Sequence, residues 1–132
     1  MNKLEGIIIH ITSQDDLSLI DLKVDNDLFT TILINSDDID YLKTDNKVFI
    51  LFKETEVSIA KNLSGILSIR NKMRSKVKEI VKGKILTKVV LDYKDKSIIS
   101  IITTRSVNEL DLQIGDEVDA LVKTNEVSIM KA

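Results

Sequence analysis

The sequence contains no cysteine, and histidine occurs once, as His10. Without cysteine there is no disulfide framework and no thiolate ligand, and one histidine cannot build a multi-histidine metal site. Zinc chemistry and cysteine catalysis are therefore excluded, and His10 is expected to be a surface or edge residue. No apolar run approaches the roughly 18 residues of a membrane span. A soluble protein without a membrane partner is predicted.

The first residues, MNKLEGIIIHI, lack a basic leader followed by an apolar segment and a small-residue cleavage site. We therefore expect no signal peptide and a cytoplasmic location. Large aromatic side chains are also scarce, since the chain has no Trp, three Phe and two Tyr. If the chain consists of two modules of about half its length, each module would have a thin hydrophobic core. We therefore expect such modules to pack on each other and on further chains.

The net charge of −2 conceals a strong difference between the two halves of the chain. Residues 1–64 hold six Lys and no Arg against twelve acidic residues, a formal charge of −6. Residues 65–132 hold thirteen basic and nine acidic residues, a formal charge of +4. An anionic ligand is therefore expected to prefer the second half.

A tandem repeat relates these halves. Glu-Val-Ser-Ile at residues 56–59 recurs at residues 126–129, an offset of 70, and a lysine precedes each copy. Near the other end of the repeat, Asn2 and Lys3 recur as Asn71 and Lys72, an offset of 69. Agreement at both ends predicts two modules, residues 1–64 and residues 65–132.

Each module is predicted to consist mostly of short strands. Stretches rich in Ile, Val, Leu and Thr alternate with polar turns, as expected of strands. In the first module they are Gly6–Ile11, Leu17–Val24, Phe29–Ile34, Lys47–Phe52 and Glu56–Ala60. Five such strands predict an all-β protein of two tandem OB-like five-stranded barrels.

One helical turn is expected after the third strand of each module, at residues 36–39 and 104–107. Ser36 or Thr104 can cap the exposed amides of such a turn. Asp45-Asn46 and Gly115-Asp116 predict turns before the fourth strand, and residues 62–69 predict a linker between the modules.

The segment that enters the second module, Ser68-Ile69-Arg70-Asn71, carries the clearest functional signal. Together with Ile-Ile-Thr at 101–103, Gly-Asp-Glu-Val at 115–118 and Lys-Thr-x-Glu-Val at 123–127, it resembles the Mop or TOBE domain of molybdate-binding proteins. The resemblance is clear over residues 66–132 and weaker over residues 1–61, and the pair of modules is similar to two-module molbindins.

This resemblance implies an OB-like fold, assembly into a homo-oligomer with a trimer favoured, and molybdate or tungstate bound between modules. The Ser-x-Arg-Asn segment of one module would meet the Lys-Thr segment of another. The resemblance nominates these oxyanion-binding residues, the last two as secondary contributors: Ser68, Arg70, Asn71, Lys123, Thr124, Thr103 and Ser106.

The donor chemistry agrees independently. A tetrahedral dianion presents only acceptors, so its site needs hydroxyl, amide and cationic donors. The nominated residues are such donors, and no acid, base or nucleophile is required. Neither an enzyme nor an organic cofactor is therefore expected.

The first module lacks half of this signature. It has no counterparts of Ser68 and Arg70, and Glu54 stands where the second module has Thr124. A carboxylate at that position should repel a dianion. We therefore expect the first module to be a packing partner that contributes at most Lys53 to a site.

Other interpretations remain open from sequence alone. Arg70, Lys72, Arg74, Lys76 and Lys78 alternate on one strand, which predicts either a solvated charged face or an anionic partner. A nucleic-acid-binding OB module would need stacking aromatics, yet residues 65–132 contain only Tyr93. A sensor or a scaffold that has lost anion binding is a further alternative to intracellular storage.

Overall fold

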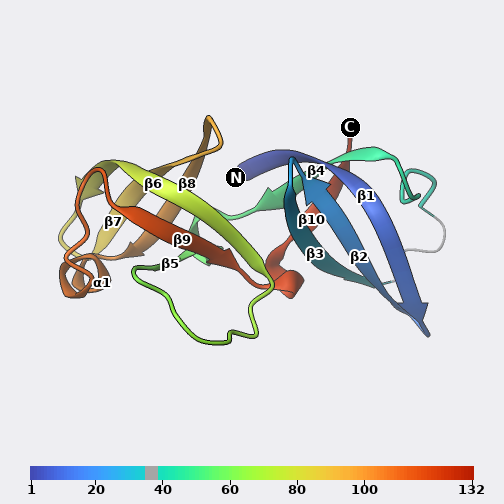
Figure 1. Ribbon diagram of the computed structural model, residues 1–132, viewed down its shortest axis with the longest axis horizontal. Coiled ribbons are helices and arrows are strands. Elements are labelled where there is room, and N and C mark those ends of the chain that lie inside the picture. The colour runs from blue at the N-terminus through green and yellow to red at the C-terminus, as the bar shows by residue number, and fades with distance from the viewer. Residues whose placement is uncertain (35–38) are drawn as a thin grey trace.

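The structure, a computed structural model, describes residues 1–34 and 39–132, and it is almost entirely β. Alternation of apolar and polar residues along each strand buries one face and exposes the other, which produces two curled sheets (Figure 1). The described strands are β1 (Asn2–Gln14), β2 (Leu17–Val24), β3 (Asp27–Ile34), β4 (Lys47–Phe52), β5 (Ser58–Ala60), β6 (Asn71–Lys82), β7 (Leu86–Tyr93), β8 (Lys96–Thr103), β9 (Glu117–Val122) and β10 (Ser128–Lys131).

Three short helical segments accompany the strands: the 3₁₀ turns η1 (Glu54–Glu56) and η2 (Thr124–Glu126), and the α-helix α1 (Thr104–Glu109). The expected all-β architecture of two OB-like five-stranded units is confirmed. The β2 and β4 bounds agree with the sequence prediction. The predicted strand at residues 56–60 is instead the end of η1 followed by the short strand β5.

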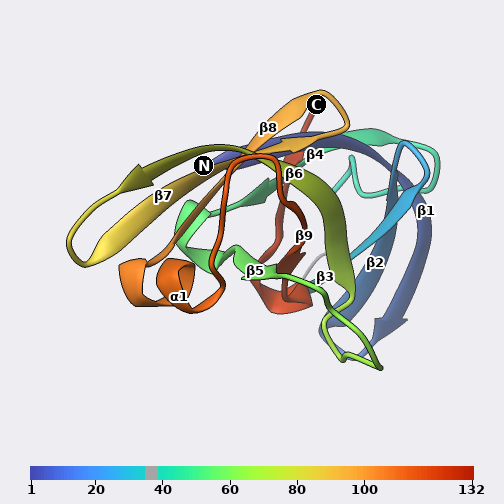
Figure 2. The same ribbon diagram turned by 60° about the vertical axis from the view of Figure 1, so that its left-hand side comes forward.

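Each sheet takes its last strand from the other half of the chain. The first sheet has the order β10-β4-β1-β2-β3, and the second has the order β5-β9-β6-β7-β8. Ile129 on β10 lies opposite Ile50 on β4, and Ile59 on β5 lies opposite Ala120 on β9. Residues 1–64 and 65–132 therefore describe the sequence repeat, whereas each sheet contains strands from both segments (Figures 1 and 2).

Two buried asparagines join the sheets across their open edges. The Asn71 side chain accepts from Thr30 N at 2.7 Å and donates to Thr30 O at 2.9 Å. Asn2, its counterpart in the repeat, makes the same two bonds with Ile99, both at 2.8 Å. Because β3 and β8 are edge strands, each asparagine satisfies backbone groups that would otherwise lack partners.

Two hydroxyl groups reinforce this connection. Thr31 Oγ1 donates to Val127 O at 2.6 Å, and Ser100 Oγ donates to Val57 O at 2.7 Å. All four residues are buried, so each bond replaces solvent contacts that the peptide groups have lost. The expected packing of the modules on each other is confirmed, and one hydrophobic cluster includes side chains from both halves.

The helical turn of the second half begins at the expected residue, Thr104, but its capping residue differs. Thr103, rather than Thr104, is its N-cap, and its side chain accepts from Ser106 N at 3.1 Å. Thr104 Oγ1 donates instead to Gly83 O at 2.8 Å. Most of the turn predicted at residues 36–39 lies outside the described residues. Gly115 adopts a φ of 93°, which agrees with the predicted turn there.

In the described part of the chain, no helix has the length and apolar character needed to cross a membrane.

Candidate functional site

Two of the nominated residues, Arg70 and Thr124, line one hollow of about 360 Å³. Arg70 immediately precedes β6, and Thr124 is the first residue of η2. They are 54 positions apart in the sequence. The other lining residues belong to β2 and β3 of the first sheet, namely Leu19, Asp21, Leu28 and Thr30.

The asparagine and threonine bonds at the β3 edge bring these segments together. Asn71 fixes the start of β6 against Thr30, and Arg70 is its immediate neighbour. On the same strand, Thr31 Oγ1 bonds Val127 O and lies 3.3 Å from Thr124 O, which holds η2 in place. The hollow therefore exists because the two halves dock through β3.

The electrostatics of the hollow are mixed. The Arg70 side chain is exposed, and it forms no hydrogen bond or ion pair with the described residues. Thr124 is half-buried. Asp21 Oδ1 accepts from Thr30 Oγ1 at 3.0 Å, so the hollow also holds a carboxylate. An unpaired guanidinium and a hydroxyl can both donate to an oxyanion.

The other members of the nominated signature flank the hollow or support it. Ser68, two residues before Arg70, is exposed. Lys123, one residue before Thr124, is exposed as well. Neither side chain lines the hollow. Asn71 has no exposed surface, and both its side-chain polar atoms are paired with Thr30. The structure thus uses Asn71 to dock the segment that carries Arg70.

Thr103 and Ser106 belong to a different part of the molecule. Their hydroxyl groups lie 2.8 Å apart at the start of α1, at the far end of the second sheet from η2 (Figure 1). Thr103 lines a separate hollow of about 360 Å³ with Arg105 and neighbouring residues. The structure does not bring Thr103 or Ser106 to Arg70.

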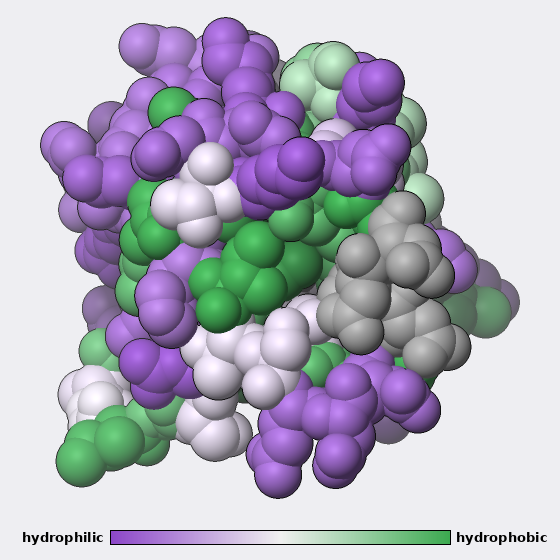
Figure 3. All heavy atoms as spheres, turned by 90° about the vertical axis from the view of Figure 1, so that its right-hand side faces the viewer, coloured by the Kyte–Doolittle hydropathy of each residue, from purple (hydrophilic) through white to green (hydrophobic). Residues whose placement is uncertain are grey.

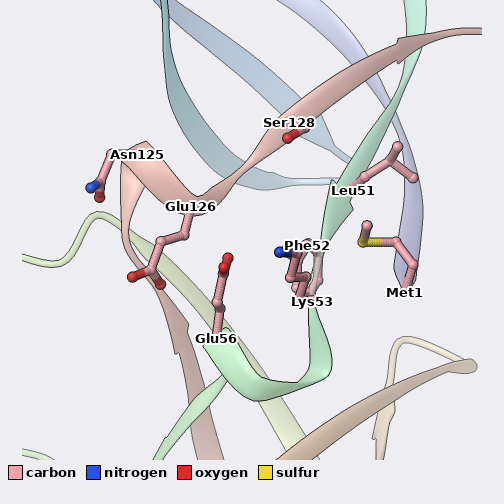
Figure 4. A pocket seen from close by; sticks show the side chains of 8 residues that line it. All are labelled: Met1, Leu51, Phe52, Lys53, Glu56, Asn125, Glu126 and Ser128. Carbon is pink, nitrogen blue, oxygen red and sulfur yellow. The ribbon is translucent and has the colours of Figure 1, made fainter.

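Lys53 also lines a separate hollow, of about 180 Å³, near the exchanged strands. Figure 4 shows the Glu56 side chain between those of Lys53 and Glu126. Two carboxylates in this hollow make it less favourable for an anion than the Arg70 hollow. Glu54, the counterpart of Thr124, pairs with the terminal ammonium of Met1. The hydrogen bond from that ammonium is the main cause that lowers the pKa of Glu54.

The sequence prediction missed the floor of the hollow. The residues of this floor, all from the acidic first half, are Leu19, Asp21, Leu28 and Thr30. That half was expected to contribute at most Lys53. No local pattern marks these residues, because they reach Arg70 only through docking of the halves. The recurrence of Asn2 as Asn71 was the available signal that the same contact is made twice.

Comparison with known proteins identifies the family of this chain. Residues 67–129 match the TOBE domain. Molybdenum-pterin-binding protein 1 of Clostridium pasteurianum is 38% identical over 65 residues, which are 48% of this chain and 96% of that protein. The chain belongs to the Mop/TOBE family.

Mop/TOBE relatives also include a larger protein. The molybdenum import ATP-binding protein ModC of Brucella abortus (strain 2308) is 36% identical over 87 residues, or 65% of this chain. The match covers 24% of ModC, so this chain spans about a quarter of that relative.

Solved structures of molybdate-binding proteins are also similar to this chain. The cytoplasmic molybdate-binding protein ModG, in a molybdate-bound form, superposes with a TM-score of 0.91 at 22% identity, covering 99% of this chain and 96% of ModG. That likeness shows the fold. A molybdate-binding protein from Sporomusa ovata is 48% identical with a TM-score of 0.50, covering 51% of this chain and all of that protein.

Proposed function

We propose that this protein binds molybdate or tungstate without catalysing a reaction, as an intracellular store or buffer of the oxyanion. The main support is that Arg70 and Thr124, which belong to two distant segments of the family signature, line one hollow. The names of the Sporomusa ovata and ModG proteins, both molybdate-binding, support the same ligand class.

The donors of the hollow suit such an ion. Molybdate and tungstate are tetrahedral dianions that present only acceptors, and an unpaired arginine offers several N–H donors in a planar fork. Thr124 lines the same hollow, and the exposed Ser68 and Lys123 lie next to it in sequence, two residues before Arg70 and one residue before Thr124 respectively. The site we propose therefore consists of Arg70 and Thr124, with Ser68 and Lys123 at its rim.

A second copy of this chain is the partner that would close the hollow. The outward face of β2 and β3 carries exposed apolar side chains: Leu17, Leu19, Leu28, Ile32 and Ile34. Figure 3 faces the first-sheet end of the molecule and shows apolar side chains gathered within a hydrophilic rim. Because Leu19 and Leu28 also line the hollow, covering this face would remove water from the anion and strengthen each contact. We propose a homo-oligomer, with a trimer favoured.

Nucleic acid is a poorer ligand for this surface. The only aromatic residue of the second half, Tyr93, is fully buried, and its hydroxyl donates to Asp27 Oδ2 at 2.5 Å. It therefore cannot stack on a base. A gel-shift series across salt concentrations should show no complex.

Native mass spectrometry with and without molybdate tests the proposed function and the assembly together. We expect an oligomer that gains molybdate, and the same oligomer without gained mass when Arg70→Ala is examined. A matched control is Arg105→Ala at the α1 end, because Arg105 is exposed and forms no hydrogen bond or ion pair with the described residues. A strict monomer that gains no mass would overturn both proposals.

A further inference from the structure

The hollow that holds Arg70 and Thr124 contains a carboxylate, which is unexpected in a site for a dianion. Asp21 lies on β2 directly opposite Thr30 on β3, and its side chain is 27% exposed. Thr30 itself is buried and donates its hydroxyl proton to Asp21 Oδ1 at 3.0 Å. Both residues line the hollow.

This polar pair occurs in only one half of the molecule. At the offset of 69 residues, the counterparts of Asp21 and Thr30 are Val90 and Ile99, which lie opposite each other on β7 and β8. The strand pairing is the same, so the backbone does not require a polar pair here. The acidic residue therefore occurs only in the half whose strands line the hollow with Arg70.

The carboxylate opposes anion binding in two ways. A negative charge within the hollow repels a dianion, and partial burial reduces the screening of that repulsion by water. In addition, the Thr30 hydroxyl donates its single proton to Asp21, so it cannot donate to an oxyanion at the same time. The floor of the hollow thus lowers the affinity that its cationic rim provides.

The remaining charged neighbours do not cancel this effect. No hydrogen bond or ion pair joins Arg70 to Asp21 in the described part of the chain. On the other side, the exposed His10 has its Nδ1 3.9 Å from Asp21 Oδ2. Asp21 therefore faces an arginine that shares the hollow without being paired to it.

We propose that Asp21 sets the affinity of the site: it repels the bound oxyanion and keeps the Thr30 hydroxyl from donating to it, so the ion stays readily exchangeable. This inference rests on the proposed function. It assigns to the acidic first half a role in the site, which is to make release easy. A store must return its contents, and a site without the carboxylate would hold them more tightly.

Calorimetric titration of molybdate into Asp21→Asn at one fixed pH tests the inference. Asparagine removes the charge while its carbonyl can still accept from Thr30, and we expect affinity to rise by about five- to tenfold. Asp92→Asn is the matched control, because Asp92 is an exposed carboxylate on the outward face of β7. It changes the net charge equally, and we expect its affinity to stay within twofold of the wild type.

A second variant, Asp21→Val, copies the residue of the second half and frees the Thr30 hydroxyl. We expect it to bind at least as tightly as Asp21→Asn, and urea unfolding confirms that both variants fold. Affinity equal to that of Asp92→Asn, or weaker, in both Asp21 variants would overturn the inference while wild-type binding upholds the proposed function. Absence of molybdate binding in every variant and the wild type would overturn the proposed function itself.

Discussion

The two halves of this chain share one fold but differ at the positions where they meet. The hairpin turn between β2 and β3 carries Asp25 and Asp27, and the equivalent turn between β7 and β8 carries Lys94 and Lys96. These turns contact each other, with Lys94 Nζ 3.3 Å from Asp27 Oδ2 and Lys96 Nζ 3.5 Å from Asp25 Oδ2. Two identical modules in this arrangement would oppose like charges. The tandem chain has instead divided the charges between its copies, which favours pairing of unlike halves.

The outward faces show the same division. The first half exposes Leu19 and Ile32 as a cross-strand pair, whereas the second half has Lys88 opposite Ile101 at the equivalent place. An apolar face suits contact with another protein surface, and a basic face suits solvent or an anion. The repeat therefore provides one fold twice, with different surfaces for different contacts.

The largest effect should follow from breaking the feature that the halves share. Asn71→Ala would leave Thr30 N and Thr30 O buried without these partners, and Asn2→Ala would remove the partners of the part-buried Ile99 N and Ile99 O. We expect each variant to lose about 2–4 kcal/mol of unfolding free energy, measured by urea denaturation. Equal losses would show that the two junctions are energetically equivalent. A loss below about 0.5 kcal/mol for Asn71→Ala would contradict its docking role.

These junctions also show where sequence reasoning ends. The repeat and the alternation of apolar residues predicted ten short strands, and they did so because each signal is local. These local signals could not predict that β5 pairs with β9 and β10 with β4. Both β4 and β9 offer an apolar face, so either strand could pair with the segment of Ile59 or with that of Ile129. The family resemblance nominated Asn71 as an anion ligand, but its side chain is buried and paired with the backbone of Thr30.

The next largest effect concerns anion binding, where a residue of the second half is compared with one of the first. We expect Arg70→Ala to weaken molybdate binding at least about thirtyfold, because a charge-assisted contact is worth roughly 2 kcal/mol or more. Lys53→Ala is the matched change in the first half. It should alter affinity less than about twofold, since Lys53 lies in another hollow beside Glu56. Calorimetry of both variants measures this difference. An equal loss of affinity in Lys53→Ala would show that Lys53 belongs to the anion site.

A smaller effect concerns the charged contact between the hairpins. Burial, and then the hydrogen bond to Asp27, raises the pKa of Tyr93 above its usual range. Because the folded chain favours the protonated phenol, this stabilisation is complete below about pH 10 and is lost as pH rises further.

We therefore expect Tyr93→Phe to cost about 1–2 kcal/mol at pH 7 and to unfold less steeply than the wild type above pH 10. The measurement is urea unfolding as a function of pH. Tyr41→Phe is the control, since no hydrogen bond joins the Tyr41 hydroxyl to the described residues. An unchanged alkaline slope in Tyr93→Phe would show that the hairpin contact does not protect its phenol.

The smallest effect should come from the basic face of β6. Lys72, Lys76 and Lys78 are exposed, and none forms an ion pair with the described residues. Salt at about 0.15 M screens such charges beyond roughly 8 Å, so replacing all three with Gln should change molybdate affinity less than about twofold. Unfolding free energy should stay within about 0.5 kcal/mol. Lys43→Gln in the first half is the control, and a fivefold loss confined to the triple variant would make this face part of the binding surface.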